Sequence, residues 1–148
     1  NQEHVESQHM MGVSLSKGKG VKKDPKEAFS WYLRAANRGY AQSQFAVAEA
    51  YRTGSGTKKD LKKAAEWHAR SAEQGHPTSQ YRLGEMYANG QGVKQDWVQA
   101  HQWCILASTL GGTPPTDCKK RNEKKMNAEQ LKEARAKAGE WIHSHRPR

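Results

Sequence analysis

The sequence is poor in several residue types on which other classes of protein depend. Only 2 of its 148 residues are cysteines, only 2 are phenylalanines, and the apolar fraction is 34%. That fraction is below the usual range for globular chains. No apolar run approaches the roughly 18–20 residues that a membrane-spanning helix needs. The two cysteines form no C-x-x-C pair, so they give no indication of a metal site.

Acidic residues are also scarce relative to basic ones. The chain has 25 Lys and Arg against 15 Asp and Glu, and its formal net charge is +10 at pH 7. This surplus makes an anionic partner or surface plausible. The length predicts one domain. The chain starts at Asn1 rather than Met, which indicates that something was removed or trimmed, and the lack of a visible signal peptide is uninformative.

The two cysteines, Cys104 and Cys118, lie on either side of a proline-rich turn. Two interpretations stay open: a disulfide, which suits an exported protein, or two free thiols. The turn from Gly111 to Asp117 can fold back far enough to bring the Cα atoms within the roughly 4.4–6.8 Å that a disulfide requires. Such a bridge would hold the C-terminal segment against the preceding part of the chain.

What the sequence does contain is a repeat. Trp31 recurs 36 residues later as Trp67 and again as Trp103, and no insertion breaks the phase. A fixed period of this size is typical of a solenoid, in which no unit can bury its apolar face alone. A solenoid presents a surface rather than a pocket, so its default function is binding. The other repeated positions are Gly18, Gly54 and Gly90; Gly20, Gly56 and Gly92; Asp24, Asp60 and Asp96; Ala28, Ala64 and Ala100; and Gly39, Gly75 and Gly111.

Each repeat is predicted to be a pair of helices. In residues 41–76, Val47 and Tyr51 are four apart and therefore share one face of a first helix, helix A. Gly54 suits the left-handed position that ends a helix. After a loop, Asp60 is a natural N-cap for a second helix, helix B. The fold class is therefore predicted to be all-α.

The repeated residues are interpreted as a scaffold for packing and capping. The period predicts equivalent settings for Trp31, Trp67 and Trp103, and three differently packed tryptophans would count against the repeat. His68 lies within the packed arc of its helix and is interpreted as a packed boundary residue rather than as a ligand. Specificity is expected at the positions that vary between repeats.

The three copies together resemble a known family. They read GVSLSKGKGVKKDPKEAFSWYLRAANRG, AEAYRTGSGTKKDLKKAAEWHARSAEQG and LGEMYANGQGVKQDWVQAHQWCILASTLGG. This pattern is similar to the Sel1-like repeat, a relative of the tetratricopeptide repeat with a longer loop between its helices. The resemblance covers about residues 5–112, and its departures are mild: Leu15, Thr57 and Ser108 replace an expected Tyr, Val and Ala.

The resemblance implies a right-handed α/α superhelix of three repeats that serves as a non-catalytic adaptor or scaffold. Members of the family are often exported or periplasmic in bacteria, and a periplasmic or secreted location is therefore expected. The family shares no reaction, but some cysteine-rich members have been described as binding penicillin or hydrolysing β-lactams. A cell-wall-related enzyme of that kind is the alternative function.

The period divides the chain into four segments. We expect one solenoid domain over residues 1–148, because stacked repeats share one continuous core. The last segment leaves the period: a fourth repeat would need glycine at two positions where the chain has Met126 and Ala128. This segment is interpreted as a cap on the open end of the stack. The expected segments are repeats at about 5–40, 41–76 and 77–112 and a capping segment at 113–148.

Local signals predict two helices in the capping segment. A short helix is expected near Cys118, after the chain-breaking TPPTD. Asn127 is predicted to cap a last helix, with Gln130 at the capping-box position. The last helix has a single apolar stripe, made of Leu131, Ala134, Ala138, Trp141 and Ile142.

No set of catalytic residues stands out. Three S-x-x-K strings have the spacing by which serine penicillin-binding enzymes place a lysine beside the nucleophile, but neither S-D-N nor K-T-G accompanies them. We therefore expect no catalytic residue and no cofactor. His143 and His145 could bind a metal weakly, yet a mobile polar tail is the favoured interpretation, and no metal is expected. The strings run from Ser14 to Lys17, from Ser16 to Lys19 and from Ser55 to Lys58.

The favoured function is the binding of a protein or peptide. The positive net charge of the chain favours an acidic partner, and the chain is expected to be a monomer. If helices A line the concave face, as in tetratricopeptide relatives, the register places one set of helix A residues on that face, where they form the binding surface. His9, Val13 and Lys17 begin it, and Asn89 lies one position past Ala88, the strict equivalent of Arg52. The predicted partner-binding residues are Gln42, Phe45, Glu49, Arg52, Thr78, Tyr81, Glu85 and Asn89.

Lysines also recur in the loops between helices A and B, which stacking would align along one edge. One interpretation is a solvated edge that keeps the solenoid soluble. The other is an electrostatic dock for an acidic protein, an anionic glycan or nucleic acid. Nucleic acid is the weakest of these, because no aromatic residues are interleaved with the lysines. The lysines are Lys22, Lys23 and Lys26; Lys58, Lys59, Lys62 and Lys63; and Lys94.

Overall fold

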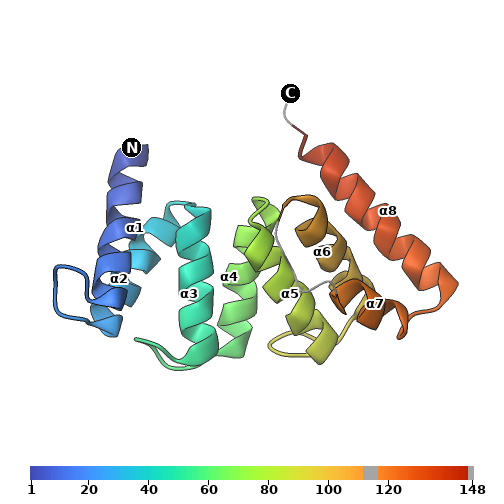
Figure 1. Ribbon diagram of the computed structural model, residues 1–148, viewed down its shortest axis with the longest axis horizontal. Helices are drawn as coiled ribbons and strands as arrows, with labels where there is room; N and C mark the ends of the chain where they lie inside the picture. Colours follow the sequence, from blue (N-terminus) through green and yellow to red (C-terminus); the bar gives the residue numbers. More distant parts are fainter. Residues whose placement is uncertain (112–116, 147–148) are drawn as a thin grey trace. The chain divides into compact units, whose positions relative to one another are not determined.

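The computed structural model describes residues 1–111 and 117–146, and within these ranges it contains eight α-helices and no strand (Figure 1). The chain divides into two compact units, residues 1–74 and 75–148. A single domain over residues 1–148 stays a prediction. Unit 1 contains α1 (Gln2–Lys17), α2 (Pro25–Asn37), α3 (Ala41–Thr53) and α4 (Leu61–Glu73); unit 2 contains α5 (Pro77–Asn89), α6 (Trp97–Thr109), α7 (Asp117–Glu123) and α8 (Ala128–Ser144).

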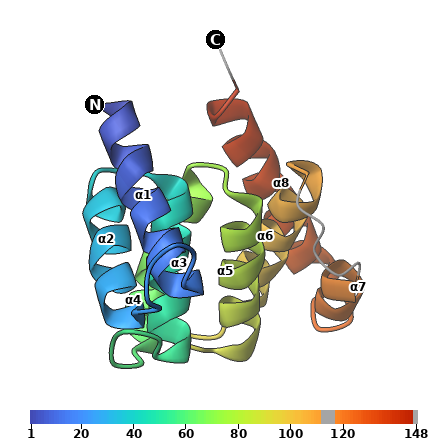
Figure 2. The ribbon, with the colours of Figure 1, turned by 60° about the vertical axis from the view of Figure 1, so that its left-hand side comes forward.

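In unit 1 each helix packs against the next one along the chain. α1 and α3 are helices A, α2 and α4 are helices B, and α2 contacts both helices A (Figures 1 and 2). The predicted caps are confirmed. Gly18 and Gly54 end the helices A in the left-handed conformation, at φ 72° and 75°. The Asp24 and Asp60 side chains accept hydrogen bonds from backbone N–H groups in the first turns of α2 and α4.

Small residues allow the helices of unit 1 to approach closely. Ala28, Val47, Ala48 and Ala64 are buried in its core. A Cβ atom at Gly12 would lie only 2.7 Å from the ring of Tyr32. Because alanine and glycine make the tight contacts, a low apolar fraction is compatible with a packed core.

The α3–α4 loop of unit 1 also touches the start of α2. Gly56, in the α3–α4 loop, has φ of +76°, and a Cβ atom there would overlap the carbonyl oxygen of Pro25 at the start of α2. Glycine is therefore required at position 56 for two reasons: the backbone conformation is left-handed, and there is no room for a side chain. Gly20, one period earlier, has the same conformation, φ +73°, but nothing lies within 4 Å of its Cβ position.

In unit 2, α6 is the central helix. α5, α7 and α8 all pack against it. A disulfide links Cys104 of α6 to Cys118 of α7, with Cα atoms 6.3 Å apart. The capping box of α8 is confirmed: Asn127 Oδ1 accepts from the Gln130 N–H, and Gln130 Oε1 accepts from the Asn127 N–H.

The two tryptophans of unit 1 have the equivalent settings that the period predicts. Both are half-buried, and both are covered by an arginine three residues further along the helix. The Arg34 guanidinium lies 4.6 Å from the centre of the Trp31 ring, and that of Arg70 lies 4.4 Å from the centre of the Trp67 ring. These are cation–π contacts on the outer face of a helix B.

The prediction of an equivalent setting was wrong for Trp103. Its side chain is buried, with 5% of its surface exposed, and its ring meets that of Trp141 edge to face at 6.4 Å. The reason is that α8 covers this face of α6. At the position of the two unit 1 arginines α6 has Leu106, which is fully buried. The odd tryptophan therefore reflects the cap and does not contradict the repeat.

Candidate binding surface

All eight residues predicted to bind a partner lie on the surface of α3 or α5. Gln42, Thr78 and Asn89 are exposed, and the other five are half-buried. Ala88, the strict equivalent of Arg52, is buried in unit 2, so the exposed Asn89 is the surface residue at that end of α5. The positions are accessible in each unit, and their role in binding stays a prediction.

On α3 the predicted residues form a polar cluster with α4. Glu49 Oε1 and Oε2 accept from Arg52 Nε at 2.9 Å and Nη2 at 2.8 Å. His68, on α4, is fully buried; its Nε2 lies 3.0 Å from Glu49 Oε1, and its ring is 5.6 Å from the ring of Phe45. The hydrogen bond to Glu49 raises the pKa of Arg52, so this guanidinium stays charged.

His68 was predicted to be a packed boundary residue. It is packed, but it lies in the interior rather than at the boundary, and its contact with Glu49 was not predicted. The sequence carried one signal, the variable residue type at this position: Tyr32 in the first repeat, His68 in the second and Cys104 in the third.

On α5 the predicted surface is partly occupied by the chain's own α7. Arg121 Nη1 and Nη2 donate to the two carboxylate oxygens of Glu85 at 3.0 and 2.6 Å. This geometry is the bidentate one that makes arginine–carboxylate pairs specific. Burial, followed by the nearby Glu85 carboxylate, raises the pKa of Tyr81, so its hydroxyl stays protonated at neutral pH. The sequence predicted a cap at this end, but not this contact.

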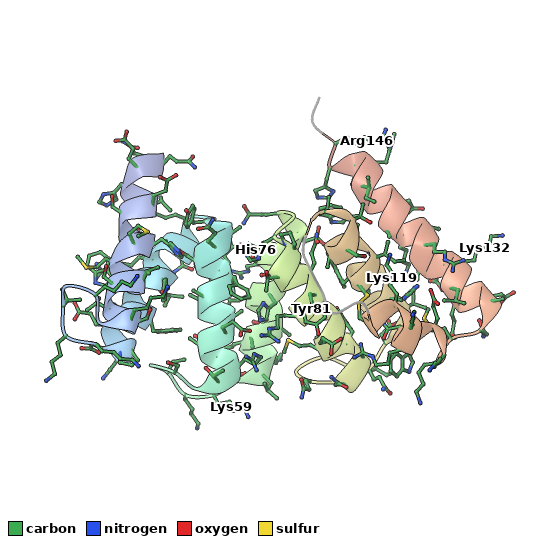
Figure 3. All side chains as sticks on the ribbon, in the orientation of Figure 1. Lys59, His76, Tyr81, Lys119, Lys132 and Arg146 are labelled. Carbon is green, nitrogen blue, oxygen red and sulfur yellow. A yellow bond between two sulfur atoms is a disulfide. The ribbon has the colours of Figure 1, made fainter. Side chains whose placement is uncertain are left out.

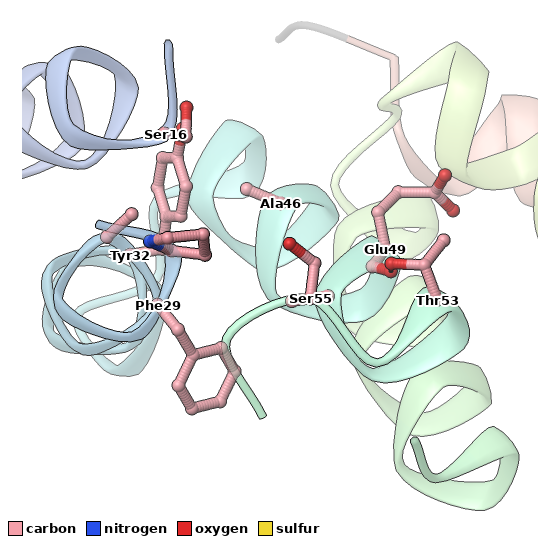
Figure 4. Close-up of a pocket in the computed structure, with 10 residues that line it drawn as sticks. Ser16, Phe29, Tyr32, Ala46, Glu49, Thr53 and Ser55 are labelled. Atoms are coloured by element: carbon pink, nitrogen blue, oxygen red, sulfur yellow. Dashed lines mark hydrogen bonds between the residues drawn. The ribbon is translucent and has the colours of Figure 1, made fainter. Parts of the chain in front are cut away.

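Unit 1 also contains a hollow that the sequence did not reveal. It lies between α1, α2 and α3 and has a volume of about 240 Å³ (Figure 4). Phe29 and Tyr32 of α2 line it, and the Tyr32 hydroxyl lies 3.2 Å from Ser16 Oγ on α1. The remaining lining residues are Pro25, Ala28, Ala46, Glu49, Ala50, Thr53 and Ser55. We call this cavity the unit 1 hollow.

At the corresponding positions of unit 2 the chain carries a disulfide. Two periods after Tyr32 and Ala46, which line the unit 1 hollow, the chain has Cys104 and Cys118. These two cysteines are joined between α6 and α7. By register, α7 therefore takes the place of a fourth helix A, although the signature residues of a fourth repeat are absent.

The recurring lysines of unit 1 lie on neighbouring loops. Lys22, Lys23 and Lys26 flank Pro25, and Lys58 and Lys59 follow Gly56, which rests on Pro25. All five lysines are exposed, and Lys59 projects from its loop in Figure 3. The predicted edge of lysines is thus present within unit 1.

The described residues contain no group of three His, Cys, Asp or Glu side chains that could hold a metal ion. Nor does any helix in the described ranges have the length and apolar character to cross a membrane. His143 lies on α8, which runs through Ser144, and the His145 ring stacks on Trp141 at 3.8 Å. The mobile tail stays a prediction, and its last two residues lie outside the described ranges.

These features define a class, that of proteins built from helix–loop–helix repeats with a glycine-containing loop. The sequence model of the Sel1 repeat matches residues 5–40, 41–76 and 77–112. The chain belongs to the Sel1 repeat family. Its fold class is that of the α/α superhelical repeat proteins, with three Sel1 repeats and a C-terminal capping helix.

Two solved structures show the same fold. The chain is 35% identical to c5321, described as a protective antigen present in uropathogenic Escherichia coli strains and displaying an SLR fold, with a TM-score of 0.86 over 94% of this chain and 30% of that one. It is 33% identical to a Sel1 repeat protein from Oxalobacter formigenes, with a TM-score of 0.72 over 74% of this chain and 45% of that one. The chain therefore spans less than half the length of either protein. None of the curated proteins matches it.

Proposed function

We propose that this chain is a non-catalytic adaptor that binds a protein or peptide through the outward faces of its helices A. Sel1 repeats generally act as protein-interaction scaffolds. The observation that carries the proposal is a division between two kinds of position on α3. The packed positions, such as Val47 and Ala48, are fully buried, whereas Phe45, Glu49 and Arg52 reach the surface. These three positions differ among the repeats: the first repeat has His9, Val13 and Ser16 there, and the third has Tyr81, Glu85 and Ala88. Specificity is expected where the scaffold does not constrain the residue.

A native lysate provides the test, with the purified chain immobilised and captured proteins identified by mass spectrometry. We expect Arg52→Ala and Tyr81→Ala to weaken capture while lowering the free energy of unfolding by only about 1 kcal/mol, because both side chains are half-buried rather than part of the core. Glu66→Ala, on the exposed face of α4, is the matched control. Capture that both helix-A variants leave unchanged would contradict the proposal.

We assign no reaction to the chain. Ser16, which belongs to one of the S-x-x-K strings, donates to the Val13 carbonyl at 3.0 Å and contacts the Tyr32 hydroxyl. Its hydroxyl is thus engaged with groups other than Lys19. A nitrocefin assay on the purified chain checks this assignment. We expect no turnover above buffer; turnover abolished by Ser16→Ala or Ser55→Ala would overturn it.

We also propose that the protein works in an oxidising compartment, periplasmic or extracellular. The support is the disulfide between Cys104 and Cys118, since such bonds persist mainly outside the cytosol. The relative described as a protective antigen agrees with this location. Fractionation of the source cells with an antibody against the chain tests it, and recovery only in the cytosol would count against export.

A further inference from the structure

The unit 1 hollow is a recess with a mainly apolar lining. The rings of Phe29 and Tyr32 and the methyl groups of Ala28, Ala46 and Ala50 face it. Its volume of about 240 Å³ is smaller than the roughly 300–1,000 Å³ of pockets for drug-sized ligands. The recess therefore suits a single large side chain rather than a cofactor. Aromatic side chains that fill such recesses commonly contribute most to the affinity of an interface.

No carboxylate is directed into the hollow. Glu49 lines it, but its carboxylate points away from Phe29 and Tyr32 (Figure 4) and is held by Arg52 and His68. The polar atoms at the rim are hydroxyl groups, those of Ser16, Ser55 and Thr53 among them. A cationic side chain would find no charge partner in the recess, whereas an apolar or aromatic one would contact rings and methyl groups.

Lysines lie close in the chain to residues at one end of the hollow. Pro25 and Ser55 line it, and each stands next to one of the lysine-bearing loops. Within the described residues none of these lysines forms an ion pair. Of the acidic residues next to these lysines in the sequence, Asp24 and Asp60 accept hydrogen bonds from helix N-termini, and Glu27 follows Lys26. Six lysines thus stand against three carboxylates. The lysine charges are therefore left for a partner, and complementary charge is negative. The lysines, which we call the rim lysines, are Lys22, Lys23, Lys26, Lys58, Lys59 and Lys62.

Unit 2 has different side chains at the corresponding register. At the register of Tyr32 and Ala46 it carries the Cys104–Cys118 disulfide, which ties α7 to α6. In unit 1 the residues at the same register, Tyr32 and Ala46, line the hollow.

From these observations we propose that the unit 1 hollow and the rim lysines together bind an acidic peptide segment of a partner protein. One aromatic side chain of the segment occupies the hollow, and its flanking carboxylates pair with the rim lysines. The inference rests on the proposed adaptor function and deepens it by naming the chemistry of the partner.

The test uses three fluorescein-labelled peptides and the full chain. The first is made of aspartate and glutamate with one central phenylalanine, the second has alanine at the centre, and the third has the phenylalanine between lysines. Fluorescence anisotropy measures their affinities, and amide shifts in ¹H–¹⁵N spectra locate the bound peptide. We expect the first peptide to shift amides around Phe29, Tyr32 and Ala50, and to bind about tenfold or more tightly than the second, because only it buries a large apolar side chain.

Two variants separate the hollow from the charge. Ala46→Phe fills the hollow, and the triple variant Lys22→Glu, Lys26→Glu and Lys58→Glu inverts the rim. We expect each to weaken the first peptide about tenfold or more, since each removes one of the two contributions. Glu66→Phe, which adds an exposed ring on α4, and a triple charge inversion on unit 2 are the matched controls, and both should bind as the parent does. The unit 2 inversion is Lys124→Glu, Lys125→Glu and Lys132→Glu. If Ala46→Phe does not fold, as judged by circular dichroism, Ser16→Leu fills the hollow from α1 instead.

Several outcomes would overturn the inference. Equal affinity for the phenylalanine and alanine peptides would leave only a charged patch. Tighter binding of the lysine peptide would reverse the charge assignment, and amide shifts confined to unit 2 would relocate the site. No saturable binding of any peptide would also reject it. The adaptor function stands apart from these results, because it fails only if Arg52→Ala and Tyr81→Ala leave partner capture unchanged.

Discussion

Helix B of the third repeat, α6, differs from the helices B of unit 1 along a whole face. In unit 1 that face carries a half-buried tryptophan covered by an arginine, as with Trp67 and Arg70. In α6 the same two positions are Trp103 and Leu106, and both are buried. One signature residue thus serves two purposes. It is a surface feature where a helix B faces solvent and a core residue where α8 covers it.

The hollow and the disulfide show a similar difference at another register. In unit 1 a recess lies beside Tyr32 of α2 and Ala46 of α3, whereas the equivalent Cys104 and Cys118 are bonded in unit 2. The spacing of helices A therefore continues into α7 after the signature residues of the repeat have ended. The repeat geometry outlasts its sequence pattern because packing against α6, the disulfide to Cys104 and the ion pair of Arg121 with Glu85 on α5 together hold α7 at this register.

The largest expected difference concerns the tryptophans. Trp103→Ala should lower the free energy of unfolding by about 3–5 kcal/mol, because it leaves a cavity beneath α8. Trp67→Ala should cost about 1 kcal/mol, since a half-buried ring loses partial burial and one cation–π contact. Urea denaturation followed by circular dichroism measures both. Equal losses would show that the two settings do not differ in energy.

The second prediction concerns the disulfide of unit 2. Replacing both Cys104 and Cys118 with alanine should lower the free energy of unfolding by about 3 kcal/mol, the value for a loop of this length. The parent chain, denatured without reductant, should release no thiol in an Ellman titration. Two thiols per chain in that titration would show that the cysteines are free in solution.

Two glycines one period apart sharpen the comparison within unit 1. Gly20→Ala should cost about 1–2 kcal/mol, since only the left-handed backbone opposes a side chain there. Gly56→Ala should cost more, because the methyl group would also collide with the Pro25 carbonyl and push the α3–α4 loop away from α2. Thermal unfolding of the two variants provides the measurement. A smaller loss for Gly56→Ala would mean that the α3–α4 loop does not touch α2.

The smallest effect is a pH dependence of unit 2. His101 is buried on α6, and burial lowers its pKa. The equivalent residue of the first repeat, two periods earlier, is Phe29. The Glu123 carboxylate, with Oε1 3.9 Å from His101 Nε2, raises this pKa, whereas the positive charges of Arg135 and Lys119 lower it further. The unfolded chain therefore binds the proton more readily, so stability should fall as pH drops below about 6.5.

His101→Phe, which copies the residue of the first repeat, should flatten the dependence of stability on pH between neutral and mildly acidic solution. His143→Gln, at an exposed position on α8, is the control and should leave the slope as it is in the parent. Urea midpoints of the parent and the two variants, measured across this pH range, provide the comparison. An unchanged slope in His101→Phe would show that other groups govern acid sensitivity.

Much of the fold could be predicted because its signals are local. Asp24, Asp60 and Asn127 each cap a helix through an N–H group a few residues away, so the sequence alone locates the starts of α2, α4 and α8. The candidate surface was predicted less completely. The register placed Glu85 at the surface, but its partner Arg121 lies on another helix and could not be inferred from spacing.

One feature of unit 2 could have been predicted and was missed. Arginine stands at this position of the helices B in both repeats of unit 1, and its replacement by Leu106 signals that α6 is covered on that side. The change from arginine to leucine indicates burial only if another element can cover that side of the helix. The predicted capping segment is such an element. The lesson is that departures from a repeat should be compared with the expected position of its cap.

By itself the sequence determined the period, the helix–loop–helix unit, the capped ends of the helices and the family. These depend on the conformational preferences of residues and on contacts within a few positions. The tertiary structure decided which tryptophan is buried, where α7 meets Glu85, that Cys104 lies beside Cys118, and that a hollow stays open beside Tyr32. These depend on side chains far apart in the chain that meet only when the helices pack, and no local pattern encodes such meetings.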